Sequence, residues 1–186
     1  IIEWPNMRKD DLIYRWPNPV IKWGSQAIVR ENQAAIFFRD GKALDVLGVG
    51  RHTLTTANLP VLTGILRRIA GFDKSPFEAE ILFINMTKFQ GKFGGKGQTK
   101  DLAPLMFHGN FWFQVSDPQV FVNEVVAGEN YTTDDVNNFI RSKFVELAID
   151  ELASYTLQQA ATRLDETSMK TKTELTDKFE EYGLKL

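Results

Sequence analysis

Cysteine is absent from this sequence of 186 residues, and that absence removes several kinds of chemistry at once. A chain without thiols forms no disulfide, offers no thiolate nucleophile, and holds neither an iron–sulfur cluster nor a zinc ion bound through Cys. Long apolar runs are also missing. A membrane-spanning helix needs roughly 18 uninterrupted apolar residues, and the nearest stretch, residues 59–72, is broken by Pro60, Gly64 and the pair Arg67–Arg68. We therefore expect no disulfide and no spanning helix. The absence of cysteine fits a reducing compartment.

Residues that catalyse reactions or bind metal ions are scarce. His52 and His108 are the two histidines; they lie far apart, and neither has a carboxylate at the spacing of a metal site. The Gly-rich residues 91–99 fail the spacing of a phosphate-binding loop, because Gln90 stands where the leading Gly belongs. Residues 48–53 begin like the Gly-x-Gly-x-x-Gly fingerprint of dinucleotide-binding proteins, but Thr53 stands where the third Gly belongs. We therefore expect no catalytic residue, no metal and no cofactor, and a protein that is not an enzyme.

Charge is unevenly distributed along the chain, although its net value of −2 is small. Residues 1–115 hold 15 Lys+Arg and 10 Asp+Glu, whereas residues 116–186 hold 7 and 14. The fractions of apolar residues, 43%, and charged residues, 25%, are ordinary for a globular domain. This asymmetry indicates charged partners or self-association, in which copies meet basic half to acidic half.

Hydrophobic patterning predicts strands in the first two thirds of the chain and helices in the last third. Strands are expected at residues 26–29, 34–38, 43–47, 77–85 and 106–115, with a hairpin turn at Asp40 and Gly41, and residues 48–54 are expected to form a Gly-bounded turn that leads into another strand. Helices are expected to start at Ser116–Pro118, at Thr132 or Thr133, near residue 157 and near residue 166, and the last to end at Gly183. Strands followed by helices, without βαβ alternation, predict an α+β fold with an antiparallel sheet of about five to six strands packed with C-terminal helices.

Three of the four tryptophans, Trp4, Trp16 and Trp23, lie in the first 23 residues, and two of them begin a Trp-Pro-Asn triplet. Proline favours extended or turn structure there. Two interpretations stay open: rings that dock on the surface of the domain, or an anchor in the headgroup region of a bilayer, which Trp prefers. We divide the chain into an extended Trp- and Pro-rich arm at residues 1–19 and one folded domain at residues 20–186.

A basic, Gly-rich stretch follows the strand expected at residues 77–85. Its four lysines recur at every fourth position: Lys88, Lys92, Lys96 and Lys100. Its glycines favour a mobile hairpin loop as the plainest interpretation. The alternative is that the lysines contact anionic lipid or another polyanion, although nearby stacking aromatics are limited to Phe89 and Phe93. These lysines and the three tryptophans of the arm are the candidate membrane or anion contacts.

Four segments resemble, in their order and spacing, motifs of the stomatin/prohibitin/flotillin (SPFH, or band 7) superfamily: residues 30–42, 48–54, 111–118 and 179–184. The first resembles the opening hairpin of the family, with Asn32 where Gly is usual, and the second its Pro-Gly-hydrophobic-His step, with Val49 where Pro is usual. The third is similar to the strand-to-helix step at Asp-Pro, and the fourth to the end of the last helix. The resemblance covers about residues 20–186. Residues 50–60, with the Trp-Pro arm, point to a soluble microbial subgroup called virion core protein-like.

The resemblance implies a scaffold and not an enzyme. Family members are similar in assembling into large rings or cages, usually on a membrane, where they organise membrane patches or regulate associated proteases and stress proteins. It implies that the full-length parent of this chain is a homo-oligomer, cytoplasmic and peripheral at the inner face of the cell membrane. There it would bind other proteins and organise membrane-associated complexes or a membrane stress response, with no nucleic acid as a partner. The alternative function is a soluble module that binds anionic lipid or another polyanion through the Lys88–Lys100 loop and the Trp arm.

The two ends of the sequence suggest that the natural chain continues. The first residue is not Met, and residues 183–186 read as a helix stop followed by the beginning of a strand. The N-terminal membrane hairpin and the C-terminal coiled coil that are usual in the family are not in this sequence. We therefore expect recruitment to the membrane by a partner, by residues beyond the termini, or by the Trp-rich arm.

Overall fold

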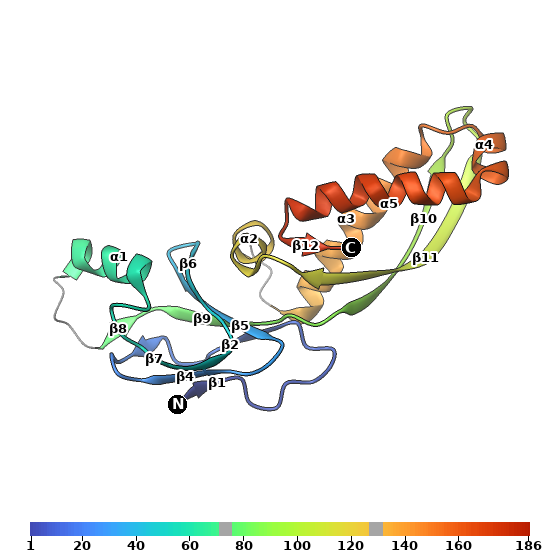
Figure 1. Ribbon diagram of the computed structural model, residues 1–186. Helices are drawn as coiled ribbons and strands as arrows, with labels where there is room; N and C mark the ends of the chain where they lie inside the picture. Colours follow the sequence, from blue (N-terminus) through green and yellow to red (C-terminus); the bar gives the residue numbers. More distant parts are fainter. Residues whose placement is uncertain (71–75, 127–131) are drawn as a thin grey trace.

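Strands predominate in the first two thirds of the chain and helices in the last third in the computed structural model, which describes residues 1–70, 76–126 and 132–186. The molecule is elongated (Figure 1). A β-rich N-terminal body, residues 1–85, lies at one end, and a C-terminal layer of a long two-stranded ribbon and helices lies at the other. The predicted α+β class is confirmed, with antiparallel strands and C-terminal helices.

The N-terminal body is built around a four-stranded antiparallel sheet. In spatial order its strands are β2 (Ile13–Arg15), β9 (Glu80–Asn85), β5 (Gln33–Arg39) and β6 (Lys42–Leu47). Two smaller sheets flank it, one of β1 (Ile2–Glu3), β4 (Gln26–Val29) and β7 (Gly50–Thr53), and one of β3 (Val20–Ile21) and β8 (Phe77–Glu78). With the sheet of the C-terminal layer, the described residues form four sheets where the sequence suggested one. Local patterning shows which residues are strands but does not show which distant strands pair.

The hairpin between β5 and β6 turns at Asp40 and Gly41, as the sequence predicts. Both residues have a positive φ, 51° and 79°, which two-residue turns need to match the twist of their strands. Aspartate and glycine are among the residues that tolerate this conformation. Arg39 and Lys42 are the pair that the turn joins, so the turn sets the register from which β5 and β6 begin to pair.

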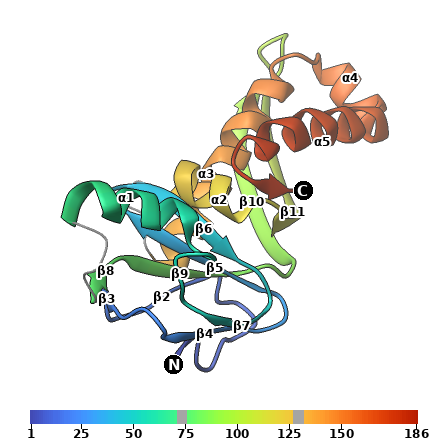
Figure 2. The ribbon, with the colours of Figure 1, turned by 60° about the vertical axis from the view of Figure 1, so that its left-hand side comes forward.

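The central sheet is buried on both faces because side chains alternate along its strands. One face contributes to the core of the N-terminal body through Ala35, Phe37, Ile81 and Phe83. The other face joins the core of the C-terminal layer through Ile36, Phe38, Leu82 and Ile84. Figure 2 shows helix α2 (Pro118–Phe121) of the C-terminal layer next to β6 of this sheet. The core of the C-terminal layer therefore extends onto one face of the central sheet, and the core of the N-terminal body lies on the other face.

Residues 1–19, the expected arm, run along the sheets of the N-terminal body. β1 pairs in parallel with β4, and β2 pairs in antiparallel fashion with β9. The side chains of Ile2, Trp4 and Leu12 are buried. The division between an arm and a domain at residue 19 stays a prediction.

Helix α1 (Pro60–Ala70) was not expected from the sequence. Pro60 takes its first position, where the backbone lacks a helical partner for an N–H in any case. The cap of this helix comes from strand β6: the Asp45 carboxylate accepts hydrogen bonds from the backbone N–H of Val61 at 3.1 Å and of Leu62 at 2.8 Å. A cap supplied from 16 residues upstream leaves no signal in the sequence next to the helix.

We expect Asp45→Ala to lower the free energy of unfolding by about 2 kcal/mol, because it leaves two N–H groups of the first turn of α1 without an acceptor. Asp45→Asn keeps an amide oxygen at the same place and should lose less than half as much. Urea unfolding followed by circular dichroism measures both losses. Equal losses in the two variants would show that capping is not what Asp45 contributes.

The C-terminal layer begins with a ribbon of two strands. β10 (Phe89–Gln98) pairs along its whole length with β11 (Pro104–Val115), and β12 (Leu184–Lys185) pairs with the end of β11. The helical elements that pack with it follow in chain order: α2 (Pro118–Phe121), the π-helical segment η1 (Val122–Val126), α3 (Thr133–Leu152), α4 (Leu157–Thr162) and α5 (Leu164–Glu180).

The helices α2 and α3 begin where the sequence predicts, because their caps are local. Asp117 caps α2 by accepting two hydrogen bonds of 3.1 Å from backbone N–H groups, and Pro118 takes the first helical position. Thr132 caps α3 by accepting a hydrogen bond of 3.1 Å from the backbone N–H of Asp135. Gly183 follows α5 with a φ of 71°, and the chain then enters β12, as expected.

Candidate interaction surface

The basic stretch between Lys88 and Lys100 is a strand and not the loop that the sequence indicates. Its residues 89–98 form β10, and every one of them is paired with a residue of β11. The prediction was wrong because glycine lowers the strand propensity of a segment judged by itself. Here the neighbouring strand supplies the bulk that the glycines lack.

Phenylalanine rings cover three glycines of the ribbon. The cross-strand pairs are Gly91 with Phe111, Gly95 with Phe107, and Gly109 with Phe93. A Cβ atom added to Gly95 would lie 2.6 Å from the ring of its partner, and one added to Gly109 would lie 2.8 Å from its partner's ring. A side chain at these positions would collide with the ring. The glycines therefore let the rings lie across the neighbouring strand, a device that stabilises strands containing glycine.

These rings form the inner face of the ribbon and pack on α3. The ring of Phe144 on α3 has its centroid 4.4 Å from that of Phe93 and 4.5 Å from that of Phe111, and it lies nearly parallel to the latter at 10°. Phe89 and Phe113 stack at 5.4 Å near the base of the ribbon. Close aromatic pairs of this kind stabilise a core beyond the area they bury. The inner face is thus occupied by α3.

The opposite side of the ribbon is exposed, and we call it the outer face: the side chains of β10 and β11 that alternate with the inward rings. Lys92 and Lys96 of β10 belong to it, and Lys88 precedes the strand in the same phase. On β11 it includes Trp112, which is 57% exposed, and Met106, which is 79% exposed and paired with Lys96. The outer face therefore combines lysines with exposed apolar side chains.

The tip of the ribbon is fastened to α4. The backbone N–H of Lys100 donates a hydrogen bond of 2.7 Å to the carbonyl of Tyr155. The Asp101 carboxylate accepts hydrogen bonds from the Thr99 hydroxyl at 2.6 Å and from the backbone N–H of Leu157 at 3.0 Å. These hydrogen bonds, that of Thr99 first, hold the pKa of Asp101 below its usual value. The side chain of Lys100 is exposed beside this anchored tip.

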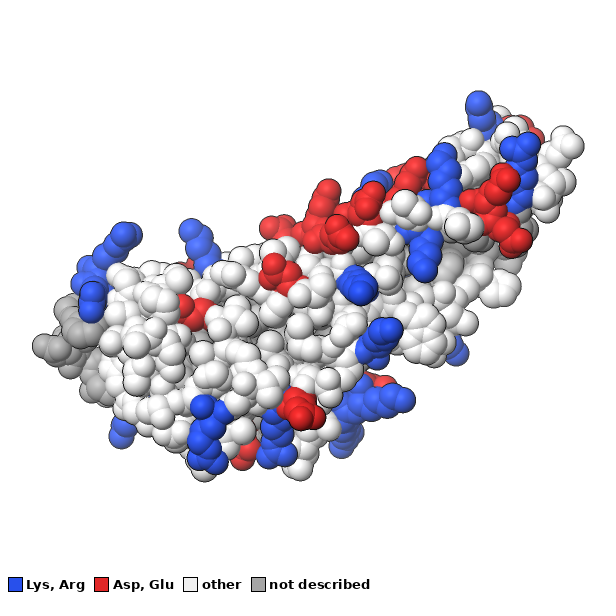
Figure 3. All heavy atoms as spheres, viewed as in Figure 1, with Lys and Arg blue, Asp and Glu red and all other residues white. Residues whose placement is uncertain are grey.

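Acidic side chains gather over the C-terminal helices (Figure 3). Exposed acids at the end of α5 include Asp177, Glu180 and Glu181. The helices pack on the inner side of the ribbon (Figures 1 and 2). The acids of the helices and the lysines of the outer face consequently lie on opposite sides of the C-terminal layer.

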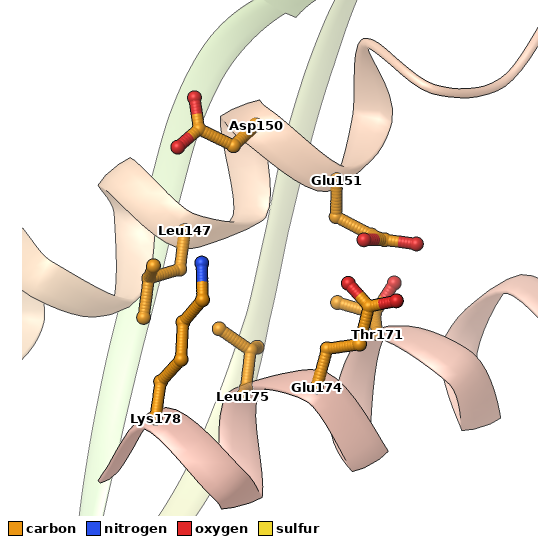
Figure 4. A pocket seen from close by; sticks show the side chains of 7 residues that line it. All are labelled: Leu147, Asp150, Glu151, Thr171, Glu174, Leu175 and Lys178. Atoms are coloured by element: carbon orange, nitrogen blue, oxygen red, sulfur yellow. The ribbon is translucent and has the colours of Figure 1, made fainter. Parts of the chain in front are cut away.

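A shallow groove of about 230 Å³ separates α3 from α5, and Figure 4 shows its lining: Leu147, Asp150, Glu151, Thr171, Glu174, Leu175 and Lys178. The Glu151 side chain, 10% exposed, accepts a hydrogen bond of 3.0 Å from the Tyr155 hydroxyl and lies 3.8 Å from Nζ of Lys170. Glu174 faces it from α5. Hydrogen bonding with the Glu151 carboxyl group, and to a lesser extent desolvation, raises the pKa of Glu174. The ion pair between Lys170 of α5 and Glu151 of α3 links the two helices across the groove.

The tryptophans of the first 23 residues lie in the N-terminal body, apart from the lysines of the ribbon. Trp4 is 4% exposed and stacks on Tyr14 with ring centroids 5.7 Å apart. Trp23 packs on Phe77 at 4.5 Å, and Trp16 is half-buried. A membrane contact by Trp4 would require it to leave this core. Trp112 was not among the contacts expected from the sequence, although its alternation with two inward phenylalanines is the signal that places it on the outer face.

Two further properties concern only the residues that the structure describes. Across residues 1–70, 76–126 and 132–186, no helix is both long and apolar enough to cross a bilayer. Within the same ranges, no three His, Cys, Asp or Glu side chains are placed together as metal ligands. The expectation of a protein without catalytic, metal or cofactor sites stays a prediction.

Comparison with known proteins agrees with the order of the sequence motifs. A family model described as SPFH domain-Band 7 family matches residues 13–186. The chain is also 30% identical over 152 residues to a protein of Bacillus subtilis (strain 168) named "Uncharacterized protein YdjI". That match covers 76% of this chain and 46% of the relative, so the chain spans about half the length of the relative.

Proposed function

The chain belongs to the SPFH domain-Band 7 family, and from this premise we propose that it is a non-catalytic scaffold that self-associates at the inner face of the cell membrane. There it organises membrane-associated protein complexes or takes part in a membrane stress response. A scaffold-type role is general in the family and does not depend on a reactive side chain. Self-association and membrane organisation are the parts of the proposal that require experiment.

The observation that supports self-association is the separation of charge within one chain. Residues 1–115 have five more basic than acidic residues, and residues 116–186 have seven more acidic than basic residues. When unlike halves of two copies meet, each copy still offers its other half to a further copy. A head-to-tail contact of this kind repeats from one copy to the next. The assembly closes into a ring when the rotation that relates neighbouring copies brings the last copy back to the first.

We expect the double variant Asp177→Lys/Glu181→Lys to self-associate roughly tenfold more weakly than the unchanged chain at low ionic strength, because attraction to the basic half becomes repulsion. Both positions are exposed and lie at the C-terminal end of α5, where lysine favours the helix. Sedimentation velocity over a series of protein and salt concentrations measures the association.

The matched control is Asp10→Lys/Glu31→Lys, which makes the same change in charge at two exposed positions of the N-terminal body. It should leave association nearly unchanged or strengthen it. Added salt should weaken the association of the unchanged chain, because exposed charges are screened. A chain that stays monomeric at low salt, or whose assembly is indifferent to salt, would contradict the proposal.

A second candidate function, binding of anionic lipid or another polyanion, is favoured by the outer face of the ribbon. Its lysines share one side of a strand and lie on a different surface from the acids of α5. Self-association through the helices and contact of the ribbon with a charged surface are therefore compatible in one molecule.

A further inference from the structure

We infer that the outer face of the β10–β11 ribbon is a contact surface for a bilayer that contains anionic phospholipid. The inference builds on the proposed function, to which it adds the surface that meets the membrane and the class of lipid that it meets. It rests on the charge, the exposed apolar side chains and the shape of this face.

The charge of the ribbon segment is almost entirely of one sign. Residues 86–115 contain four lysines and a single acid, Asp101. That acid lies at the tip, where its carboxylate accepts hydrogen bonds from the Thr99 hydroxyl and the backbone N–H of Leu157, and the segment keeps three more basic than acidic residues. Lysines close to an anionic membrane surface each strengthen binding, and the effect falls away within a Debye length. A row of lysines on one face is therefore suited to a surface more than to a single small anion.

Exposed apolar side chains lie among these lysines. Trp112 and Met106 belong to the outer face, and Leu102, 74% exposed, lies at the turn of the ribbon. Tryptophan prefers the interfacial region of a bilayer, where its ring meets acyl chains and its N–H meets water. Membrane-surface binding combines attraction to anionic lipid with burial of apolar area, and both ingredients are present on this face.

The shape of the ribbon suits an extended surface. Ten residues of β10 span about 33 Å at the rise of an antiparallel strand. The inward rings on Phe144 and the hydrogen bonds of the tip to α4 hold this length in place. Because the acids of the helices lie on the opposite side of the layer, an anionic surface attracts the ribbon side and repels the helix side. The charge distribution thus orients the layer with its ribbon toward the membrane.

Two other occupants fit this face less well. A single-stranded nucleic acid is bound by a series of stacking aromatics, and on the outer face one indole, Trp112, is available while the phenylalanines face inward. The acidic end of α5 of a second copy matches the lysines, but its exposed Asp177, Glu180 and Glu181 are unsuited to contact with the apolar side chains of the outer face. A bilayer with anionic phospholipid offers negative headgroups to the lysines and an apolar interior to the exposed apolar side chains.

The test uses the whole 186-residue chain and vesicles of phosphatidylcholine with or without phosphatidylglycerol. We expect binding to vesicles with phosphatidylglycerol, measured by co-flotation, and little binding to phosphatidylcholine alone. Lys92→Gln/Lys96→Gln should bind about 30-fold more weakly, on the order of fivefold for each lysine. The matched control, Lys42→Gln/Lys172→Gln, removes two exposed lysines elsewhere and should bind as the unchanged chain does.

A further readout comes from Trp112 itself. Its emission should shift to shorter wavelength when the vesicles are added, and Trp112→Phe should abolish the shift while the fold is retained. A shift that survives in Trp112→Phe would place the contact at another tryptophan and overturn the inference. The same holds for equal binding to both kinds of vesicle, or equal losses in the two lysine variants.

Failure of this inference is distinguishable from failure of the proposed scaffold. Sedimentation without vesicles reports self-association, and Lys92→Gln/Lys96→Gln should weaken it less than Asp177→Lys/Glu181→Lys does, because residues 1–115 then keep three more basic than acidic residues. If Lys92→Gln/Lys96→Gln loses self-association but still binds vesicles, the ribbon is an interface between copies and the inference is overturned. If the chain is monomeric yet floats with anionic vesicles through the ribbon, the inference holds and self-association fails.

Discussion

Replacing Gly183 with alanine is expected to lower the free energy of unfolding by about 4 kcal/mol, more than most single substitutions do. Gly183 has a φ of 71°, which alone costs an L-residue about 1–2 kcal/mol. A Cβ at this position would also collide with the carbonyl oxygen of Asp117 and lie 2.7 Å from the backbone nitrogen of Phe121. Those atoms belong to the first turn of α2 and cannot move aside as a flexible side chain would.

The position also holds two other elements in place. The carbonyl of Gly183 accepts hydrogen bonds from the backbone N–H groups of Ser116 at 2.8 Å and Asp117 at 3.1 Å. A displaced residue 183 therefore weakens the pairing of β12 with β11 as well as the start of α2. Urea unfolding of Gly183→Ala measures the loss, and Gly48→Ala is the control, since a Cβ there meets open space. A loss below about 1 kcal/mol for Gly183→Ala would mean that the two backbones are not in firm contact.

Phe144→Ala is expected to cost about 4 kcal/mol, because it opens a cavity in the middle of the C-terminal layer. The ring stands between Phe93 of β10, Phe111 of β11 and Phe179 of α5, the last at 6.1 Å. Its removal leaves the inner face of the ribbon without its main contact on α3. The rings of Phe93 and Phe111, which cover two glycines of the ribbon, then lose the ring against which they pack.

Calorimetric or denaturant unfolding of Phe144→Ala measures this loss, with Val145→Ala as the control on the same turn of α3. Val145 is half-buried, and its truncation should cost less than about 1 kcal/mol. Similar losses in the two variants would contradict a ring stack centred on Phe144.

Sequence reasoning succeeded where a signal lies within a few residues of its effect. The caps at Asp117 and Thr132, the turn at Asp40 and Gly41, and the helix stop at Gly183 are of this kind. Each depends on a side chain or a backbone conformation that acts on its immediate neighbours. The α+β class followed from the order of the elements.

The failures have the opposite cause. Helix α1 receives its cap from Asp45 on a strand, and β10 receives its bulk from phenylalanines on β11. A local pattern contains neither partner, so α1 was not predicted and the segment of β10 was interpreted as a loop. The number of sheets was missed for the same reason, since it depends on pairings between distant strands.

The candidate surface could be predicted in part. The regular spacing of Lys88, Lys92 and Lys96 singled them out in the sequence, but only the pairing of β10 with β11 showed that they share one side and what lies beside them. Trp4 attracted attention through its place in a Trp-Pro-Asn triplet and is enclosed. Trp112 is surrounded in the sequence by phenylalanines, as a core residue would be, and lies on the outer face.

The ribbon also has a mechanical property. Its base is tied by β12 and its tip by α4, while α3 supports its span from beneath. A ribbon that is supported at both ends and along its length bends little when a force acts on it, and it passes that force to its supports. A force applied to the ribbon by whatever lies against it therefore passes into α3 and, through the shared core, into the central sheet at the far end of the molecule.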